Sequence, residues 1–167
     1  MAIVNLVGSR VMDGLDNVPK DLAAPGEAGG RVRCFVETVE VGSADSDTST
    51  YLLARVPSNA VILPTSTLYW DDLASTGAPT VDVGVFNQSG ATGITDDDNA
   101  LADGLDVTSA GSSVMPSGIA NYGLPLWDLV ASQTTDPGRM LDIKATLQDA
   151  DVNVGGTITM VLHYSVD

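Results

Sequence analysis

Acidic side chains are the residues of this chain whose clustering could support chemistry. The chain has 22 Asp and Glu against 7 Lys and Arg. Asp96, Asp97 and Asp98 form a triplet, and carboxylate oxygens are ligands that Ca²⁺ prefers. No acidic run has the twelve-residue spacing of an EF-hand loop, with its central Gly and terminal Glu. A hydrated acidic loop is therefore the expected state, and this triplet is the first candidate if an ion is bound.

Paired carboxylates could also serve as the acid and base of a glycosidase. That chemistry needs two carboxyl groups roughly 5–10 Å apart, a distance that the sequence alone does not fix. Most of the aspartates stand in segments rich in Gly, Ser, Thr and Asn, which are typical of solvated turns. We therefore expect no catalytic pair.

His163 is the single histidine and would have to be the base of any Ser-His-Asp or Cys-His arrangement. It falls on the outward side of the last predicted strand, beside no recognisable nucleophile motif. A zinc site would lack ligands, because the chain has one His and one Cys, Cys34. The glycines form neither a GxGxxG nor a GxxxxGK phosphate loop. We expect no enzymatic activity, no catalytic residue, no metal and no cofactor.

Tyr69, Trp70, Asp71 and Asp72 form an aromatic and acidic run that could hold a sugar. An aromatic ring stacks on a sugar face, and neighbouring carboxylates accept hydrogen bonds from its hydroxyl groups. The other interpretation is that Trp70 packs in the core and a turn follows it. The exposure of Trp70 distinguishes the two.

The net charge of −15 excludes some classes of partner. A surface this acidic repels phosphate backbones, so we expect no direct binding of nucleic acid. No stretch approaches the ~20 apolar residues of a membrane helix, and we expect no membrane contact. The N-terminal residues lack the charged region and long apolar run of a signal peptide. We therefore expect synthesis in a cytoplasm without export through a cleaved signal.

The spacing of apolar residues predicts an all-β domain. Val81, Val83 and Val85 alternate with other residues, and the same alternation runs through 141–147 and 158–166. These segments are expected to be half-buried strands. Further strand-like runs are 31–41, 50–57 and 60–70, the last with a break or an edge at Pro64, and 100–108.

Four local features follow from the same pattern. The apolar residues of 31–41 change phase after Val36, which predicts a bulge. Residues 149–156 predict a closing hairpin between the last two strands. Residues 125–132 begin with Pro and predict one short helix. Residues 90–117 are mostly loop-like.

Six to eight short strands with Gly, Pro and Asp turns favour a β-sandwich or jelly-roll-like domain over residues 31–167. Residues 1–30 are expected to form an extended N-terminal arm, because their prolines and glycines oppose regular helix; a flexible tail is the alternative. The apolar start of the arm is expected to bind a partner by adding a strand or filling a groove. Its contact residues are Ile3, Val4, Leu6 and Val7.

Four segments resemble small structural proteins of tailed bacteriophages: 50–61 (TYLLARVPSNAV), 81–86 (VDVGVF), 125–129 (PLWDL) and 142–147 (DIKATL). The resemblance covers most of the chain from Thr50 onward and the apolar start. It is one of general pattern, and no family residue is carried over. The best resemblance is to head decoration, or cement, proteins. It implies a non-enzymatic virion protein on the capsid exterior, made in the host cytoplasm. Such a protein, expected as a homotrimer, binds the major capsid protein and stabilises the head.

Two other interpretations stay open. A tail or fibre component that binds a host glycan would use Trp70 with Asp71 and Asp72. A secreted carbohydrate-binding or calcium-stabilised β module would use similar groups, but the sequence lacks the signal peptide that this role would require.

Overall fold

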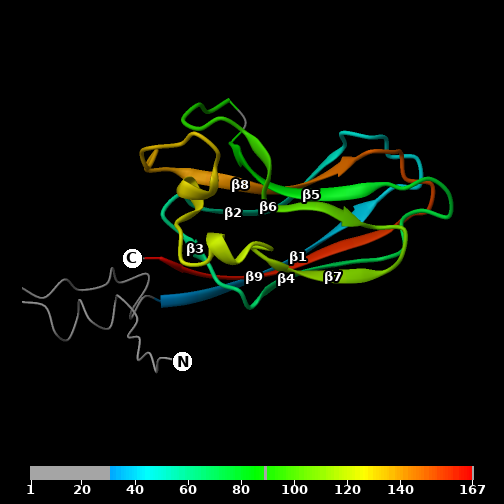
Figure 1. Cartoon of the computed structure of the whole chain (residues 1–167), viewed down its shortest axis with the longest axis horizontal. Helices are drawn as coiled ribbons and strands as arrows, with labels where there is room; N and C mark the ends of the chain where they lie inside the picture. The colour runs from blue at the N-terminus through cyan, green and yellow to red at the C-terminus, as the bar shows by residue number, and fades with distance from the viewer. Residues whose placement is uncertain (1–30, 89, 167) are drawn as a thin grey trace, which may run out of the picture.

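The computed structural model describes residues 31–88 and 90–166, which form a sandwich of two antiparallel sheets (Figure 1). The expected all-β sandwich is confirmed. The expected arm, with Ile3, Val4, Leu6 and Val7, lies outside the described residues. Among the described residues, no helix has the length and apolar character to cross a membrane.

Sheet A contains the first and last strands of the described chain. Its order is β1 (Arg31–Val41), β9 (Gly156–Val166), β4 (Ser66–Trp70) and β7 (Gly111–Met115), and the short β3 (Val61–Ile62) also pairs with β9. Sheet B has the order β2 (Thr50–Pro57), β8 (Met140–Gln148), β5 (Thr80–Asn87) and β6 (Asp97–Asp106).

Alternating apolar residues of the central strands form the core between the sheets. Val81, Val83 and Val85 of β5 are fully buried, as the sequence pattern predicted. In β8 and β9 the same alternation holds, since one side of each strand faces the other sheet. The buried side chains of these two strands are Leu141, Ile143, Ala145, Leu147, Ile158, Met160 and Leu162.

Two expectations about strand connections were wrong. β1 pairs with β9 in an unbroken register from Arg31 opposite Val166 to Val41 opposite Gly156, so there is no bulge. The change of phase has another cause, because Val36 faces solvent whereas Val41 is buried in the core. Residues 149–155 do not close a hairpin either, since they carry the chain from β8 in sheet B to β9 in sheet A.

Two further segments differ from expectation in detail. The short helix is the 3₁₀ helix η2 (Leu126–Leu129), and Pro125 caps it instead of lying in its first turn. The loop-like stretch contains more strand than expected, because β6 and β7 lie within 90–117. A second 3₁₀ helix, η1 (Ile119–Asn121), was not predicted. The break at Pro64 is confirmed, since it separates β3 from β4.

Candidate interaction face

The outward side of sheet A presents a row of side chains that crosses four strands. Val36 of β1 pairs with Val161 of β9, which pairs with Thr67 of β4, which pairs with Val114 of β7. Paired residues of neighbouring strands point to the same side of a sheet. The next row along the strands continues with Tyr69. These rows form the centre of what we call the outer face of sheet A.

Large apolar side chains are exposed on this face. Val32 is 63% exposed, Val36 58%, Tyr69 48% and Val114 43%. Isolated apolar residues are ordinary on a protein surface, but a contiguous apolar patch marks an interaction site. Here the exposed groups stand on adjacent strands of one sheet and are joined by the half-buried Val161.

Negative charge is nearly absent from this face, although the chain carries a net charge of −15. Glu40 is the single carboxylate among the outward side chains of β1, β9, β4 and β7. Contacts of this face with another protein therefore bury little charge, and buried unpaired charge is costly. The side chains on this side of the sheet are Val32, Cys34, Val36, Thr38, Glu40, Thr67, Tyr69, Ser112, Val114, Thr157, Thr159, Val161, His163 and Ser165.

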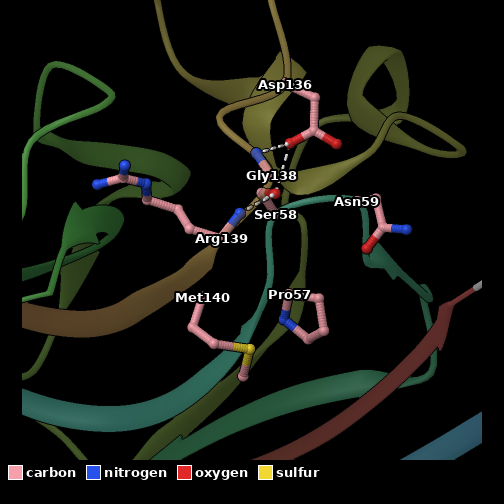
Figure 2. A pocket seen from close by; sticks show the side chains of 7 residues that line it. All are labelled: Pro57, Ser58, Asn59, Asp136, Gly138, Arg139 and Met140. Carbon is pink, nitrogen blue, oxygen red and sulfur yellow. Dashed lines mark hydrogen bonds between the residues drawn. The ribbon is translucent and has the colours of Figure 1, made fainter.

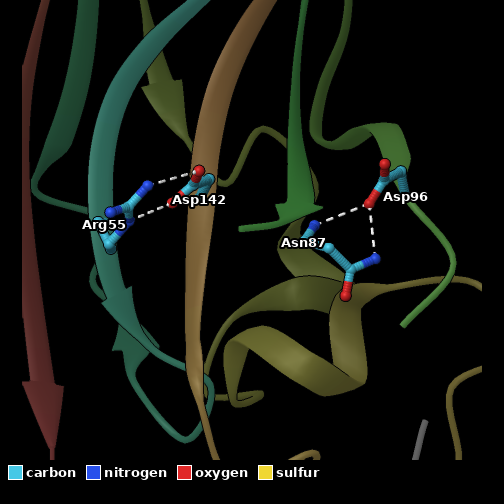
Figure 3. Close-up of polar contacts among 4 residues, drawn as sticks. All are labelled: Arg55, Asn87, Asp96 and Asp142. Carbon is cyan, nitrogen blue, oxygen red and sulfur yellow. Dashed lines mark hydrogen bonds and ion pairs between the residues drawn. The ribbon is translucent and has the colours of Figure 1, made fainter. Parts of the chain in front are cut away.

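The outward side of sheet B is different, because it carries more charged groups, and its two basic side chains are engaged within the chain. Arg55 of β2 donates to both carboxylate oxygens of Asp142 in β8, at 2.6 and 3.0 Å (Figure 3). The side chain of Asp142 is almost fully buried by this contact and its surroundings. In the neighbouring row, Lys144 lies 4.7 Å from the centre of the Phe86 ring, a cation–π contact.

The start of β6 also covers part of sheet B. A Cβ atom at Gly84 would lie 2.1 Å from the carbonyl oxygen of Asp97, so only glycine leaves room for this close approach. Nearer the other end of β6, Asp82 accepts a hydrogen bond of 2.7 Å from the backbone of Gly104. Burial raises the pKa of the Asp82 carboxyl, and repulsion from nearby aspartates adds to the shift. At Gly84, the start of β6 thus occupies the outward side of sheet B.

The three candidate calcium ligands do not gather. Asp96 accepts hydrogen bonds from the backbone and side chain of Asn87 (Figure 3). Asp97 accepts one from the backbone of Ala131, and Asp98 accepts one from the Gln148 side chain. Within 31–88 and 90–166, no three His, Cys, Asp or Glu side chains are grouped as a metal site requires. The three aspartates instead hold neighbouring segments of the chain in place through these hydrogen bonds.

His163 lies on the outward side of β9, as expected, and is half-buried. Its Nδ1 is 3.1 Å from the carbonyl oxygen of Thr65, so a protonated Nδ1 donates to that oxygen. Cys34 is its cross-strand neighbour in β1 and is exposed. The hydroxyl of Ser66 bonds only the backbone of His163, at 2.9 Å, and among the described residues no Ser or Cys side chain is hydrogen-bonded to the imidazole ring. The geometry gives His163 a structural role at the edge of the face.

Tyr69 and Trp70 do not form a joint sugar platform. Successive residues of a strand point to opposite sides, so the exposed Tyr69 faces outward while Trp70 packs against the core. Indole Nε1 of Trp70 donates to the carbonyl oxygen of Ser109 at 3.0 Å. Asp71 accepts hydrogen bonds from the backbone and hydroxyl of Thr157, which places it in a turn.

A pocket of about 410 Å³ opens where β2 ends and β8 begins (Figure 2). The Ser58 hydroxyl donates to Asp136 and accepts from the backbone N–H of Arg139. Asp136 also accepts from the backbone of Gly138. Within the described part of the chain, the lining of the pocket holds no histidine or lysine beside this serine. The arrangement ties the loop before β8 to the end of β2.

The fold is similar to that of a chain in the capsid of Ralstonia phage GP4, with a TM-score of 0.62 and 19% identity over 83% of this chain and 86% of that chain. A chain of the capsid asymmetric unit of cyanophage Pam1 aligns with a TM-score of 0.49 and 21% identity, over 93% of this chain and 100% of that chain. No family model and no curated protein sequence matches. The likeness to the GP4 chain shows a shared fold.

Sequence reasoning missed the outer face of sheet A. Two of its signals were visible: Val161 broke the polar alternation of the last strand, and the valines at 32 and 36 stood out of phase with Val39 and Val41. Both were interpreted as local irregularities. The register shows that Val36 and Val161 are neighbours.

Proposed function

We propose that this chain is a structural protein of a bacteriophage virion, a head decoration or cement protein that binds the lattice of the major capsid protein. The observation that carries the proposal is the outer face of sheet A, where exposed apolar side chains stand among hydroxyl groups with one carboxylate, on a strongly acidic chain. The fold shared with a chain in the GP4 capsid supports a virion setting.

The outer face of sheet A is the surface that contacts the shell. Its four hydrogen-bonded strands hold the backbone of Val36 and Val114 in place, so little backbone entropy is lost when the face binds. Many copies on one lattice add their contacts, so each single contact need not be strong. The protein then sits on the capsid exterior after synthesis in the host cytoplasm, and it assembles as a homotrimer. It has no catalytic activity in this role.

The N-terminal arm completes the attachment. Ile3, Val4, Leu6 and Val7 would bind a groove or strand edge on a neighbouring capsid subunit. In sequence the arm precedes β1, an edge strand of sheet A among the described residues, and β1 contributes Val36 to the proposed contact face.

Reconstitution tests the proposal. Heads assembled without this chain are mixed with the purified full chain, and bound protein is measured by sedimentation together with the resistance of the heads to heat and chelator. The proposal predicts saturable binding in a fixed ratio to the major capsid protein and heads that open at higher temperature. Absence of binding to heads, or binding to tails alone, would remove the cement role.

A tail or fibre component, or a carbohydrate-binding module, remains a different candidate for the same fold. The half-buried Trp70, bonded to the Ser109 carbonyl, does not favour it.

A further inference from the structure

The first half of β1 extends beyond the cover of the opposite sheet. Residues 31–36 are all exposed, although side chains of a sandwich strand normally alternate between core and solvent. Both sides of this segment therefore face solvent. One edge pairs with β9, and the other edge is unpaired among the described residues. An exposed strand edge with apolar side chains is a site where another chain binds.

Two arginines stand on this segment without a described partner. Arg31 and Arg33 share a side of β1 with the exposed Phe35. Neither arginine forms an ion pair or a side-chain hydrogen bond with a described residue. The other basic residues of the described chain are engaged: Arg55 with Asp142, Lys144 with the Phe86 ring, and Arg139 with the carbonyl of Thr92.

The opposite end of the sandwich is purely acidic. β1 runs from Arg31 at one end to Val41 at the other, where the loops 42–49, 71–79, 107–110 and 149–155 meet. These loops contain no Lys or Arg. Their aspartates are Asp45, Asp47, Asp71, Asp72, Asp149 and Asp151. The start of β1 thus carries two arginines, whereas the loops at the far end of this strand carry six aspartates and no cation.

We propose that the first half of β1 docks on the aspartate-rich end of a second copy of this chain. The positive charge of Arg31 and Arg33 and the negative charge of the acidic loops orient the encounter, and Phe35, on the same side of β1 as the two arginines, supplies apolar area at the contact. A symmetric contact between two copies of the first half of β1 would instead bring four arginines together and no aspartate. The charges thus favour a head-to-tail contact.

Head-to-tail contacts close into rings when the rotation between copies allows it. The contact is therefore the specific means of forming the homotrimer, and it rests on the self-association that is part of the proposed function. It uses the end of β1 and the acidic loops, which leaves the outer face of sheet A available for the shell.

The test measures self-association of the full chain by sedimentation velocity at about 50 mM and about 500 mM salt. The variant R31E/R33E is compared with R139E/K144E, which changes the net charge equally but alters basic residues away from the β1 segment. Circular dichroism melts establish that both variants fold. We expect wild-type association to weaken with salt, R31E/R33E to weaken it about tenfold or more, and the control to change little.

A charge exchange makes the test specific for the acidic end. D47K/D72K reverses two exposed aspartates of the loops and should also weaken association. Combined with R31E/R33E it should restore part of the association, because the two introduced glutamates can then pair with the two introduced lysines, although four aspartates remain in the loops. A monomeric wild type at low salt, an R31E/R33E variant that associates like wild type, or an exchange without rescue would overturn the inference.

Binding to heads is measured separately for the same variants. If the wild type self-associates through β1 but does not bind heads, the cement role is wrong and this inference stands. If the chain binds heads but R31E/R33E still self-associates like wild type, this inference fails and the cement role stands.

Discussion

Val36 of β1 lies directly opposite Val161 of β9 on the solvent side of sheet A. Cross-strand contact between two valines stabilises a strand pair by only about 0.2–1 kcal/mol. The sheet does not require valine at these two outward positions, since threonine or a charged residue would keep the strand and be more soluble. Val114 on β7 extends the same row, and the row accounts for the apolar interruptions in an otherwise polar surface.

Aspartate in this row should abolish binding while leaving the fold intact. We predict that V36D/V114D loses attachment to heads, because two charges would be buried without partners in the contact. Both side chains are exposed, so the melting temperature should change by no more than about 3 °C.

Leu52→Asp is the matched control for this variant, because Leu52 is also an exposed apolar strand residue but lies on sheet B opposite Lys144. It should bind heads like wild type. Equal loss of binding in L52D, or full binding by V36D/V114D, would show that the outer face of sheet A is not the contact.

The ion pair between Arg55 and Asp142 should show strong non-additivity. Arg55→Met leaves a nearly fully buried carboxylate without its cation, so we expect a clear loss of stability in urea unfolding. R55M/D142N removes the charge as well and should be more stable than R55M. A double variant that is less stable than R55M would contradict this account of the pair.

At neutral pH, the charge of Asp82 should destabilise the fold. A variant with an uncharged residue at position 82 should therefore be more stable. Burial first, and then repulsion from Asp103, Asp98 and Asp149, raises its pKa above the usual 3.8. The folded state therefore binds the proton more tightly than the unfolded state, and ionised Asp82 opposes folding above that range. We predict that D82N, which keeps an oxygen to accept from Gly104, melts higher at pH 7. The gain should shrink as the pH falls to about 3.

Asp106→Asn is the control of opposite sign for this pH experiment. Hydrogen bonds from the hydroxyl and backbone of Thr108 lower the pKa of Asp106. Its carboxylate thus stabilises the fold above the usual 3.8, and this contribution is lost as the pH falls through the lowered value. D106N should melt lower at pH 7 and converge with wild type in acid. Shifts of the same sign in both variants would refute the assignment.

Tyr51 should make stability sensitive to alkali. Burial, followed by the hydrogen bond that its hydroxyl donates to Asp45 at 2.5 Å, raises the pKa of Tyr51 well above 10. The unfolded chain loses this proton near pH 10, so the stabilisation is complete below that pH and is lost as the pH rises above it. Tyr51→Phe should remove most of the difference in melting temperature between about pH 8 and pH 11. An unchanged alkaline loss in Y51F would contradict the prediction.

Periodicity predicted the fold because most strands bury one side only. Val81, Val83 and Val85 are each fully buried, as their alternation indicated. The pairing of strands was less accessible to sequence reasoning. Residues 149–155 look like a hairpin turn, but the partner of β9 is the distant β1, and such long-range pairing is set by the whole core.

The candidate site was harder to predict for a physical reason. Val36 and Val161 are 125 residues apart in the chain, and only the register places them together. In the sequence alone, each valine therefore looks like a local irregularity, and the acidic runs look like the candidates for function. Asp96, Asp97 and Asp98 instead accept hydrogen bonds from three different segments, a structural use of carboxylates that no local pattern distinguishes from ion binding.

Cryo-EM of the native particle that carries this chain tests the central claim most directly. The account predicts density for the sandwich at symmetric positions on the exterior of the head, with Val36 and Val114 of sheet A against the major capsid protein. Density at the tail, or on the head with sheet B against the shell and the outer face of sheet A in solvent, would contradict it.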